Sequence, residues 1–336
     1  MDRTKGIIIF TKNRPQKLSK TLPQIVNVDL PVIVLDDSGD SKSKQVVKSI
    51  SKRSENIHYH GKIEQWMILQ KLENTNAFGP FIKPLGSDGW TLGYARNYAI
   101  ILGKIFGFEQ VLFMDDDIII EDINIIFRMF DILNNGDFVS AEIKGMPDLS
   151  VVDFVMQEIG LEPYRFMFGG FLAFSLGSVS EYFLNYYNED WIWLFLHKPK
   201  AKLVKYGEVY QLPYDPFKNA VEKALQQEFG EILVEGVKKS IENGNNTALL
   251  LNKDFWNEVI KARTSLIKCI KNLSHENNFS TGGSICKHLL NYHLKINGEE
   301  IANIFTIYFQ RRKLWCHLLY SIDHIGRCAT WVSSTK

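Results

Sequence analysis

Short apolar runs alternate with helical segments over the first 60 residues, and this alternation constrains the fold more than any other feature. Residues 6–10 (GIIIF) and 31–35 (PVIVL) predict buried strands. Helical patterns follow at residues 15–26 and 41–51, and residues 57–59 predict a third short strand. Strands and helices that alternate at this spacing favour an α/β fold with a doubly wound, mostly parallel sheet. Ligands of such sheets bind at the carboxyl ends of the strands.

Three consecutive acids follow another apolar run, residues 111–114, at the point where a buried strand would reach water. Asp115, Asp116 and Asp117 repel one another, so a divalent cation would offset their charge. Mg²⁺ or Mn²⁺ prefers oxygen ligands and is typically held by one or two carboxylates together with substrate phosphates. Residues i and i+2 of an extended chain point to the same side, so Asp115 and Asp117 can converge on one ion. The alternative is a solvated acidic turn before a helix predicted at residues 122–133.

The rest of the chain up to residue 215 continues the α/β pattern. Further strands are predicted at residues 138–141, 171–175 and 203–211. Helices are predicted at residues 92–106 and 188–197, a loop at residues 74–91 and irregular chain at residues 143–167.

The character of the sequence changes after residue 215. Beyond it only helical periodicity remains, in residues 217–242, 253–273, 285–294 and 299–325. We therefore place a domain boundary there, between an α/β domain of residues 1–215 and a helical domain of residues 216–336. The aromatic-rich stretch 304–331 predicts a helix whose apolar side faces a core. A dimer surface or a peripheral contact with an anionic membrane is the alternative.

Composition and charge argue against several classes of protein. Apolar residues make up 45% of the chain and charged residues 23%, which is typical of a globular protein with a core. The net charge of +1 argues against a nucleic-acid-binding protein. The N-terminus lacks the pattern of a signal peptide and no apolar run is long enough to cross a bilayer, so we expect a cytoplasmic protein. Its cysteines, which form no C-x-x-C pair, are expected to be reduced thiols: Cys269, Cys286, Cys316 and Cys328.

Four blocks of sequence, taken in order, resemble one known family. They are residues 8–15 (IIFTKNRP), residues 34–38 (VLDDS), residues 93–97 (GYARN) with the acids at 115–117, and Gly169-Gly170 with residues 188–191 (NEDW). Over about the first 215 residues the chain resembles glycosyltransferase family 2, whose members have the nucleotide-sugar-binding fold called GT-A. The resemblance implies a metal-dependent transferase that uses Mn²⁺ or Mg²⁺ and moves a sugar from a UDP- or GDP-sugar to a hydroxyl of a glycan, lipid-linked or peptide acceptor.

The resemblance also implies roles for individual residues. The D-x-D motif of the family matches Asp115 and Asp117, which would hold the metal, and Asp190 matches the general base. Donor binding would fall to Thr11, Arg14, Asp36, Asp37, Arg96, Asn97, Asp115 and Asp116, with Asp36 or Asp37 on the nucleobase. Acceptor binding would fall to Gly169, Gly170, Glu189 and Trp191. Many relatives place a histidine after the base as a further metal ligand, whereas this chain has Gln211 in the matching region.

The chemistry of glycosyl transfer supports these roles. Breaking a glycosyl–phosphate bond leaves negative charge on the diphosphate, which a cation held by Asp115 and Asp117 would stabilise. One base on the opposite face of the sugar, Asp190, would give inversion at the anomeric carbon. The structural alternatives are a helix cap for Asp190 and a surface ion pair for Arg96.

Three other functions remain open from the sequence. They are a retaining transferase, a sugar-nucleotide nucleotidyltransferase, and a non-catalytic module that binds a sugar nucleotide or a glycan. Nucleotidyltransferases usually have a glycine-rich loop after the first strand, and residues 11–15 contain no glycine, which disfavours that class.

Overall fold

The computed structural model describes residues 4–71, 77–133, 137–145 and 149–326. Its centre is one eight-stranded sheet with the strand order β3-β2-β1-β4-β7-β6-β8-β5. The strands are β1 (Lys5–Thr11), β2 (Val32–Asp36), β3 (Ile57–His60), β4 (Gln110–Asp115), β5 (Ile118–Ile119), β6 (Phe138–Gly145), β7 (Phe171–Ser175) and β8 (Leu203–Gln211).

Most neighbouring strands run parallel, which confirms the predicted α/β fold class. β1 pairs in parallel with β2 and β4, β2 pairs in parallel with β3, and β6 pairs in parallel with β8. β7 is antiparallel to β4 and β6, and β5 is antiparallel to β8, so the sheet is mixed. The register sets Phe10 opposite Asp115 and Thr11 opposite Asp36. The carboxyl ends of β1, β2 and β4 therefore finish level with one another, and the acids that follow them meet at one edge.

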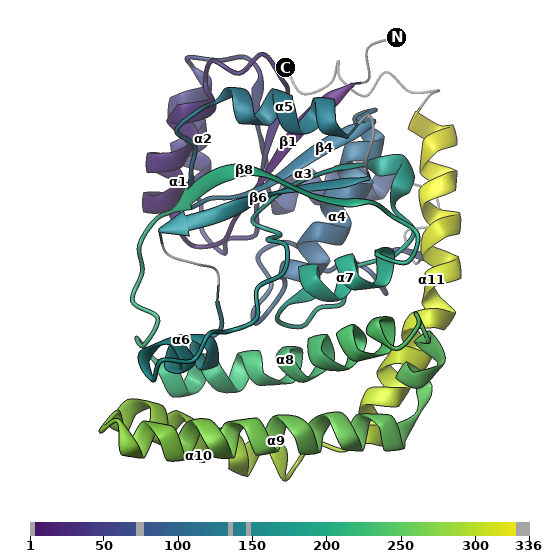
Figure 1. Ribbon diagram of the computed structural model, residues 1–336. Helices are drawn as coiled ribbons and strands as arrows, with labels where there is room; N and C mark the ends of the chain where they lie inside the picture. The colour runs from purple at the N-terminus through teal and green to yellow at the C-terminus, as the bar shows by residue number, and fades with distance from the viewer. Residues whose placement is uncertain (1–3, 72–76, 134–136, 146–148, 327–336) are drawn as a thin grey trace.

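Helices cover both faces of the sheet, and the helices after residue 215 pack below it and along one side (Figure 1). The helices are α1 (Pro15–Thr21), α2 (Lys42–Ser51), α3 (Lys62–Lys71), α4 (Leu92–Ile105), α5 (Asn124–Ile132), α6 (Val151–Glu158), α7 (Glu189–His197), α8 (Ala220–Glu242), α9 (Lys253–Glu276), α10 (Ser280–His293) and α11 (Gly298–Gly326). Short 3-10 turns lie at η1 (Leu22–Ile25), η3 (Leu176–Ser178) and η4 (Thr247–Leu251).

The alternation of side chains along the strands divides the core into two layers. Ile7 and Ile9 of β1 pack on one face, against buried side chains of α1, α2 and α5. Ile8 and Phe10 pack on the other face, in a cluster that includes side chains of α4, α7, α8, α9 and α11. Successive residues of a strand point to opposite faces, so a run such as GIIIF fills both layers.

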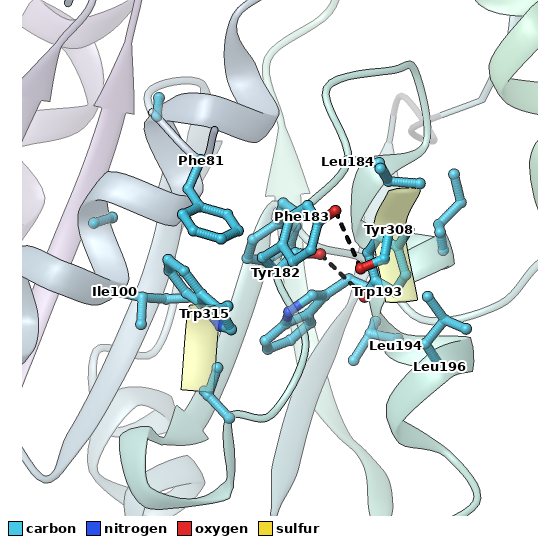
Figure 2. Packing of buried hydrophobic residues seen from close by; sticks show 14 of the residues in the cluster. Phe81, Ile100, Tyr182, Phe183, Leu184, Trp193, Leu194, Leu196, Tyr308 and Trp315 are labelled. Atoms are coloured by element: carbon cyan, nitrogen blue, oxygen red, sulfur yellow. Dashed lines mark hydrogen bonds between the residues drawn. The ribbon is translucent and has the colours of Figure 1, made fainter. Parts of the chain in front are cut away.

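One core joins residues on both sides of position 215. Figure 2 shows stacked rings within it: Phe183 lies on Trp193 and Tyr182 lies on Tyr308, each pair with centroids 4.5 Å apart. Tyr308 and Trp315 belong to α11, whereas the other three rings precede residue 215. The helical region is therefore packed on the α/β region through shared apolar surface, and its division into a separate domain stays a prediction.

The structure differs from expectation in three segments. Within residues 143–167, expected to be irregular, β6 continues to Gly145 and α6 forms behind a capping box between Ser150 and Asp153. Helix α3 was not anticipated. The helix expected at residues 15–26 ends at Thr21 and continues as a 3-10 turn, because Pro23 has no N–H to extend the α-helical bonding.

Some predicted features lie partly or wholly outside the described residues, namely residues 74–76 and 146–148, Cys328 and the end of the 304–331 stretch. Cys269, Cys286 and Cys316 are free thiols. Across the described ranges, no helix combines the length and the apolar character that a bilayer span requires.

Candidate functional site

A cavity of about 490 Å³ opens at the carboxyl edge of the sheet. Its walls come from the chain after β1, β2 and β4 and from the first turns of α4 and α7. It brings together eight residues that the sequence predicts for the site: Thr11, Arg14, Asp37, Arg96, Asp115, Asp117, Glu189 and Asp190. The proposed metal-binding acids therefore share one cavity with the proposed base.

The buried guanidinium of Arg96 lies among three carboxylates. Its nitrogens are 3.4 Å from Glu189 Oε1, 3.9 Å from Asp190 Oδ2 and 3.9 Å from Asp115 Oδ1. Burial outweighs the attraction of Arg96 and raises the pKa of Asp115, and it raises the pKa of Glu189 to about 8. One positive charge does not balance three carboxylates, so this wall of the cavity favours binding of a further cation or a proton.

Backbone amides fix the carboxylate of Asp190. The N–H of Gly169 donates to Oδ2 at 2.8 Å, and the N–H of Trp191 donates to Oδ1 at 2.9 Å. Asp190 lies in the first turn of α7, where the helix dipole favours negative charge. The result is an oriented acceptor of hydrogen bonds at the cavity wall.

Gly169 and Gly170 leave no room for a side chain beside these acids. A Cβ on Gly169 would lie 2.3 Å from Asp190 Oδ2 and 2.4 Å from Arg96 Nη1. A Cβ on Gly170 would lie 2.9 Å from Asp115 Oδ2, and the carbonyl of Gly170 accepts a hydrogen bond from the N–H of Asp115 at 2.9 Å. The two glycines do not line the cavity; they allow the acids that do line it to approach the backbone.

Two cationic side chains of the first loop and of α1 engage Asp117. Its Oδ2 lies 3.0 Å from Arg14 Nη1 and 2.7 Å from Lys17 Nζ. Gln211 Nε2 also approaches this oxygen, at 3.5 Å. Asp117 thus faces the cavity with its charge offset by neighbouring cations.

Asp116 lies outside the cavity lining, in the turn that follows β4. Its Oδ2 accepts a hydrogen bond from Thr11 Oγ1 at 2.6 Å, and its Oδ1 lies 2.8 Å from Arg14 Nη2. Burial raises the pKa of Asp116 to about 7 despite these partners. Its contacts join the loop after β1 to the loop after β4.

Asp36 and Asp37, the acids expected at the nucleobase, both accept hydrogen bonds from other side chains of the protein. Asp37 lines the cavity, and its Oδ2 accepts hydrogen bonds from Lys12 Nζ at 2.9 Å and from Thr91 Oγ1. Asp36 lies behind the cavity lining and accepts a hydrogen bond from Tyr59 Oη at 2.9 Å. Burial raises the pKa of Asp36.

Asn97 and Trp191 also lie outside the cavity lining. The amide of Asn97 is fully buried: its Nδ2 donates to the carbonyls of Phe81 (3.0 Å) and Phe183 (2.9 Å), and its Oδ1 accepts from the N–H of Phe183 (2.7 Å). The ring of Trp191 packs edge-on against Phe166. These contacts connect α4 and α7 to neighbouring chain.

Sequence reasoning missed several residues of the site. The additional residues at the cavity wall or beside Asp117 include Lys12, Lys17, Trp90, Thr91, Tyr187 and Asn188. Lys17 was detectable, because it lies in the first turn of α1, three residues after Arg14, which directly precedes the helix. Trp90 and Thr91 carried no local signal, since only the tertiary fold brings the end of that loop to the acids.

The oxygen atoms at this edge suit a divalent cation. Asp115 and Asp117 supply carboxylates, and Gln211 Oε1 is a buried acceptor that receives no hydrogen bond from any described residue. Hard cations such as Mg²⁺ and Mn²⁺ take carboxylate and amide oxygens together with substrate phosphates. Among the residues that the structure describes, no group of three His, Cys, Asp or Glu side chains could hold a metal, so two acids and one amide are the set available.

One similarity to a solved structure supports the fold. No family model and no curated protein matches the sequence. Among solved structures, the chain is similar to a mannosyltransferase from Pyrobaculum calidifontis in complex with GDP-Man and Mn²⁺, with 14% identity over 87% of this chain and 86% of that chain and a TM-score of 0.50. A mouse xyloside xylosyltransferase 1 matches less well, with 12% identity over 51% of this chain and 66% of that chain and a TM-score of 0.31. The chain therefore has a GT-A-type α/β fold, followed by a helical C-terminal region.

Proposed function

We propose that the protein is a metal-dependent glycosyltransferase that uses a nucleotide-diphospho-sugar donor. The observation that carries this proposal is the single cavity, at the carboxyl edge of a GT-A-type sheet, that Asp115 and Asp117 share with Asp190. Ligands of open α/β sheets bind at this edge.

The acidic wall is suited to the diphosphate end of the donor. Asp115, Asp117 and the carbonyl oxygen of Gln211 would hold Mn²⁺ or Mg²⁺, which when bound supplies charge stabilisation for the departing diphosphate. Arg14 and Lys17 lie on the same side and would offer further positive charge to phosphate oxygens. Removal of water from this cavity would strengthen each of these interactions.

Asp190 is the proposed general base. The acceptor hydroxyl would give its proton to the Asp190 carboxylate while its oxygen bonds to the anomeric carbon and the bond from that carbon to the diphosphate oxygen breaks. General-base assistance of this kind contributes about 10²–10⁴-fold. Arg96, 3.9 Å from Asp190 Oδ2, would hold the carboxylate in place. Attack from the face opposite the diphosphate gives inversion, which NMR of the product's anomeric configuration tests.

The donor and acceptor are proposed at the level of class. The bound GDP-Man and Mn²⁺ of the similar mannosyltransferase make this pair the first donor and metal to test, with UDP-sugars next. A glycan, lipid-linked or peptide acceptor, a cytoplasmic location, a peripheral membrane contact and a homo-oligomer remain predictions.

Two substitutions test the assignment. A thermal-shift screen of nucleotide sugars with and without Mn²⁺ identifies the donor, and release of the nucleotide diphosphate then measures turnover. Asp117→Asn is expected to abolish metal-stimulated donor binding. Asp190→Asn is expected to leave donor binding intact and to remove transfer; near-normal turnover in Asp190→Asn would show that the base is another residue.

A further inference from the structure

A largely buried cluster of charged side chains joins α8, α9 and α10, the helices that lie beneath α7 in Figure 1. Arg263 of α9 donates through Nε and Nη2 to both carboxylate oxygens of Glu228 of α8, at 2.8 and 2.9 Å. Its Nη1 lies 2.7 Å from Glu235 Oε1 and 3.5 Å from Glu231 Oε2. His293 of α10 completes the cluster, with Nε2 2.7 Å from Glu228 Oε1. The proposed reaction uses none of these groups.

One member of this cluster contacts the segment that carries the proposed base. Asn188 Nδ2 donates to Glu231 Oε1 at 3.0 Å, and Asn188 stands at the start of α7, directly before Glu189 and Asp190. Asn188 also lines the cavity, its φ of 59° is left-handed, and its side chain makes no capping hydrogen bond to α7.

The backbones of α8 and of the segment before α7 are in close contact at the same place. A Cβ on Gly230 would lie 2.1 Å from the carbonyl oxygen of Tyr187, so glycine at this position lets α8 reach that backbone. Glu231 is the next residue of α8. Its hydrogen bond to Asn188 is therefore made where the two segments already touch.

Buried ion pairs are costly to desolvate, and apolar residues of similar volume often serve stability equally well. A cluster of this kind is better explained by the geometry that it fixes. From these contacts we infer that Glu231, held by Arg263, is a positioning residue that fixes Asn188 and thereby sets Asp190 against the cavity. This inference rests on the proposed function.

Two substitutions of Glu231 separate positioning from packing and charge. Burial, with the negative charge of Asp153 nearby, raises the pKa of Glu231 to about 8, so glutamine is a close mimic of the side chain at neutral pH. Glu231→Gln keeps an acceptor for the Asn188 amide, whereas Glu231→Met has a similar volume and no such acceptor. Both variants remove the same carboxyl group, and Arg263 retains Glu228 and Glu235 in each.

The experiment measures donor binding by calorimetry. It measures kcat and KM from the rate of nucleotide release. Glu231→Met is expected to lower kcat about tenfold through the loss of one buried hydrogen bond, with donor affinity unchanged. Glu231→Gln is expected to restore kcat. The inference would be overturned if the two variants had the same kcat, whether that value equalled the wild-type kcat or lay below it.

Two further measurements keep the test decisive. If Glu231→Met does not fold, Asn188→Gly tolerates the left-handed backbone and removes the same hydrogen bond, and it should lower kcat in the same way. Hydrogen exchange over residues 187–193 gives a readout independent of turnover: it should accelerate in Glu231→Met or Asn188→Gly and not in Glu231→Gln. Absence of turnover in the unmodified protein would refute the proposed function, while unchanged exchange would refute the positioning role.

Discussion

A methyl group at Gly169 provides a sharp test of the site geometry. In Gly169→Ala the new Cβ would lie 2.3 Å from Asp190 Oδ2 and 2.4 Å from Arg96 Nη1, where ordinary contacts begin near 3.4 Å. Both side chains would have to retreat by about 1 Å, and a misplacement of that size can cost about 10²-fold in rate. We therefore expect kcat to fall about 100-fold. The three atoms nearest to the new Cβ belong to Asp190 and Arg96 and none to Asp115 or Asp117, so donor affinity should fall far less than kcat.

The assay combines initial rates of nucleotide release at saturating donor with calorimetry of donor binding. Gly177→Ala is the matched control, because no described atom lies within 4 Å of the position of its Cβ. Thermal unfolding of both variants separates a local change from loss of the fold. A Gly169→Ala protein that is folded and keeps wild-type kcat would refute the argument that Asp190 and Arg96 act from their observed positions.

Three other predictions concern single side chains. Lys17→Met should tighten the binding of Mn²⁺ about a few-fold in the absence of nucleotide, because Asp117 loses a competing cation. Weaker binding of Mn²⁺ in a titration followed by electron paramagnetic resonance would contradict this. Asp116 keeps its proton in the folded state up to about pH 7, while the unfolded state loses it near pH 4. The free energy of unfolding should therefore fall as pH rises across this window and then level off. Urea titrations at several pH values should show a weaker fall of the unfolding free energy with pH in Asp116→Asn than in the wild type. An equal pH dependence in the two proteins would contradict the raised pKa of Asp116. Asn97→Ala should destabilise the fold by about 3 kcal/mol or more, because three backbone groups lose their hydrogen bonds to the Asn97 amide. A variant with unchanged stability and weaker donor binding would instead support a role of Asn97 in donor binding.

Much of the fold could be predicted because its signals are local. Runs such as GIIIF and the alternation of strands with helices indicate buried parallel strands, and β1 and β8 agree with expectation to within a residue. Helix α6 was missed although Ser150 and Asp153 carry its start signal, since the surrounding composition favoured irregular chain. Helix α3 has no clear periodicity, because Ile63, Trp66 and Met67 are exposed.

The sequence predicted the acidic residues that line the cavity, but few of the other residues around them. Asp115 and Asp117 line the cavity and Asp116 does not, as strand alternation predicts, although β4 ends at Asp115 and the next two acids form a turn. The sequence could not indicate that the amide of Asn97 hydrogen-bonds to the backbone of residues 81 and 183, or that α8 contacts the start of α7. Both features depend on segments far apart in the chain, and only tertiary packing brings them together.

The central claim is that a cation bound by the acids after β4 bridges to a diphosphate in the shared cavity. Anomalous diffraction from crystals soaked with Mn²⁺ and GDP or UDP measures this directly. The account predicts one manganese peak coordinated by carboxylate oxygens of Asp115 and Asp117 and by the diphosphate, on the side of the cavity facing Asp190. A nucleotide bound elsewhere, or a manganese peak remote from both acids, would contradict it.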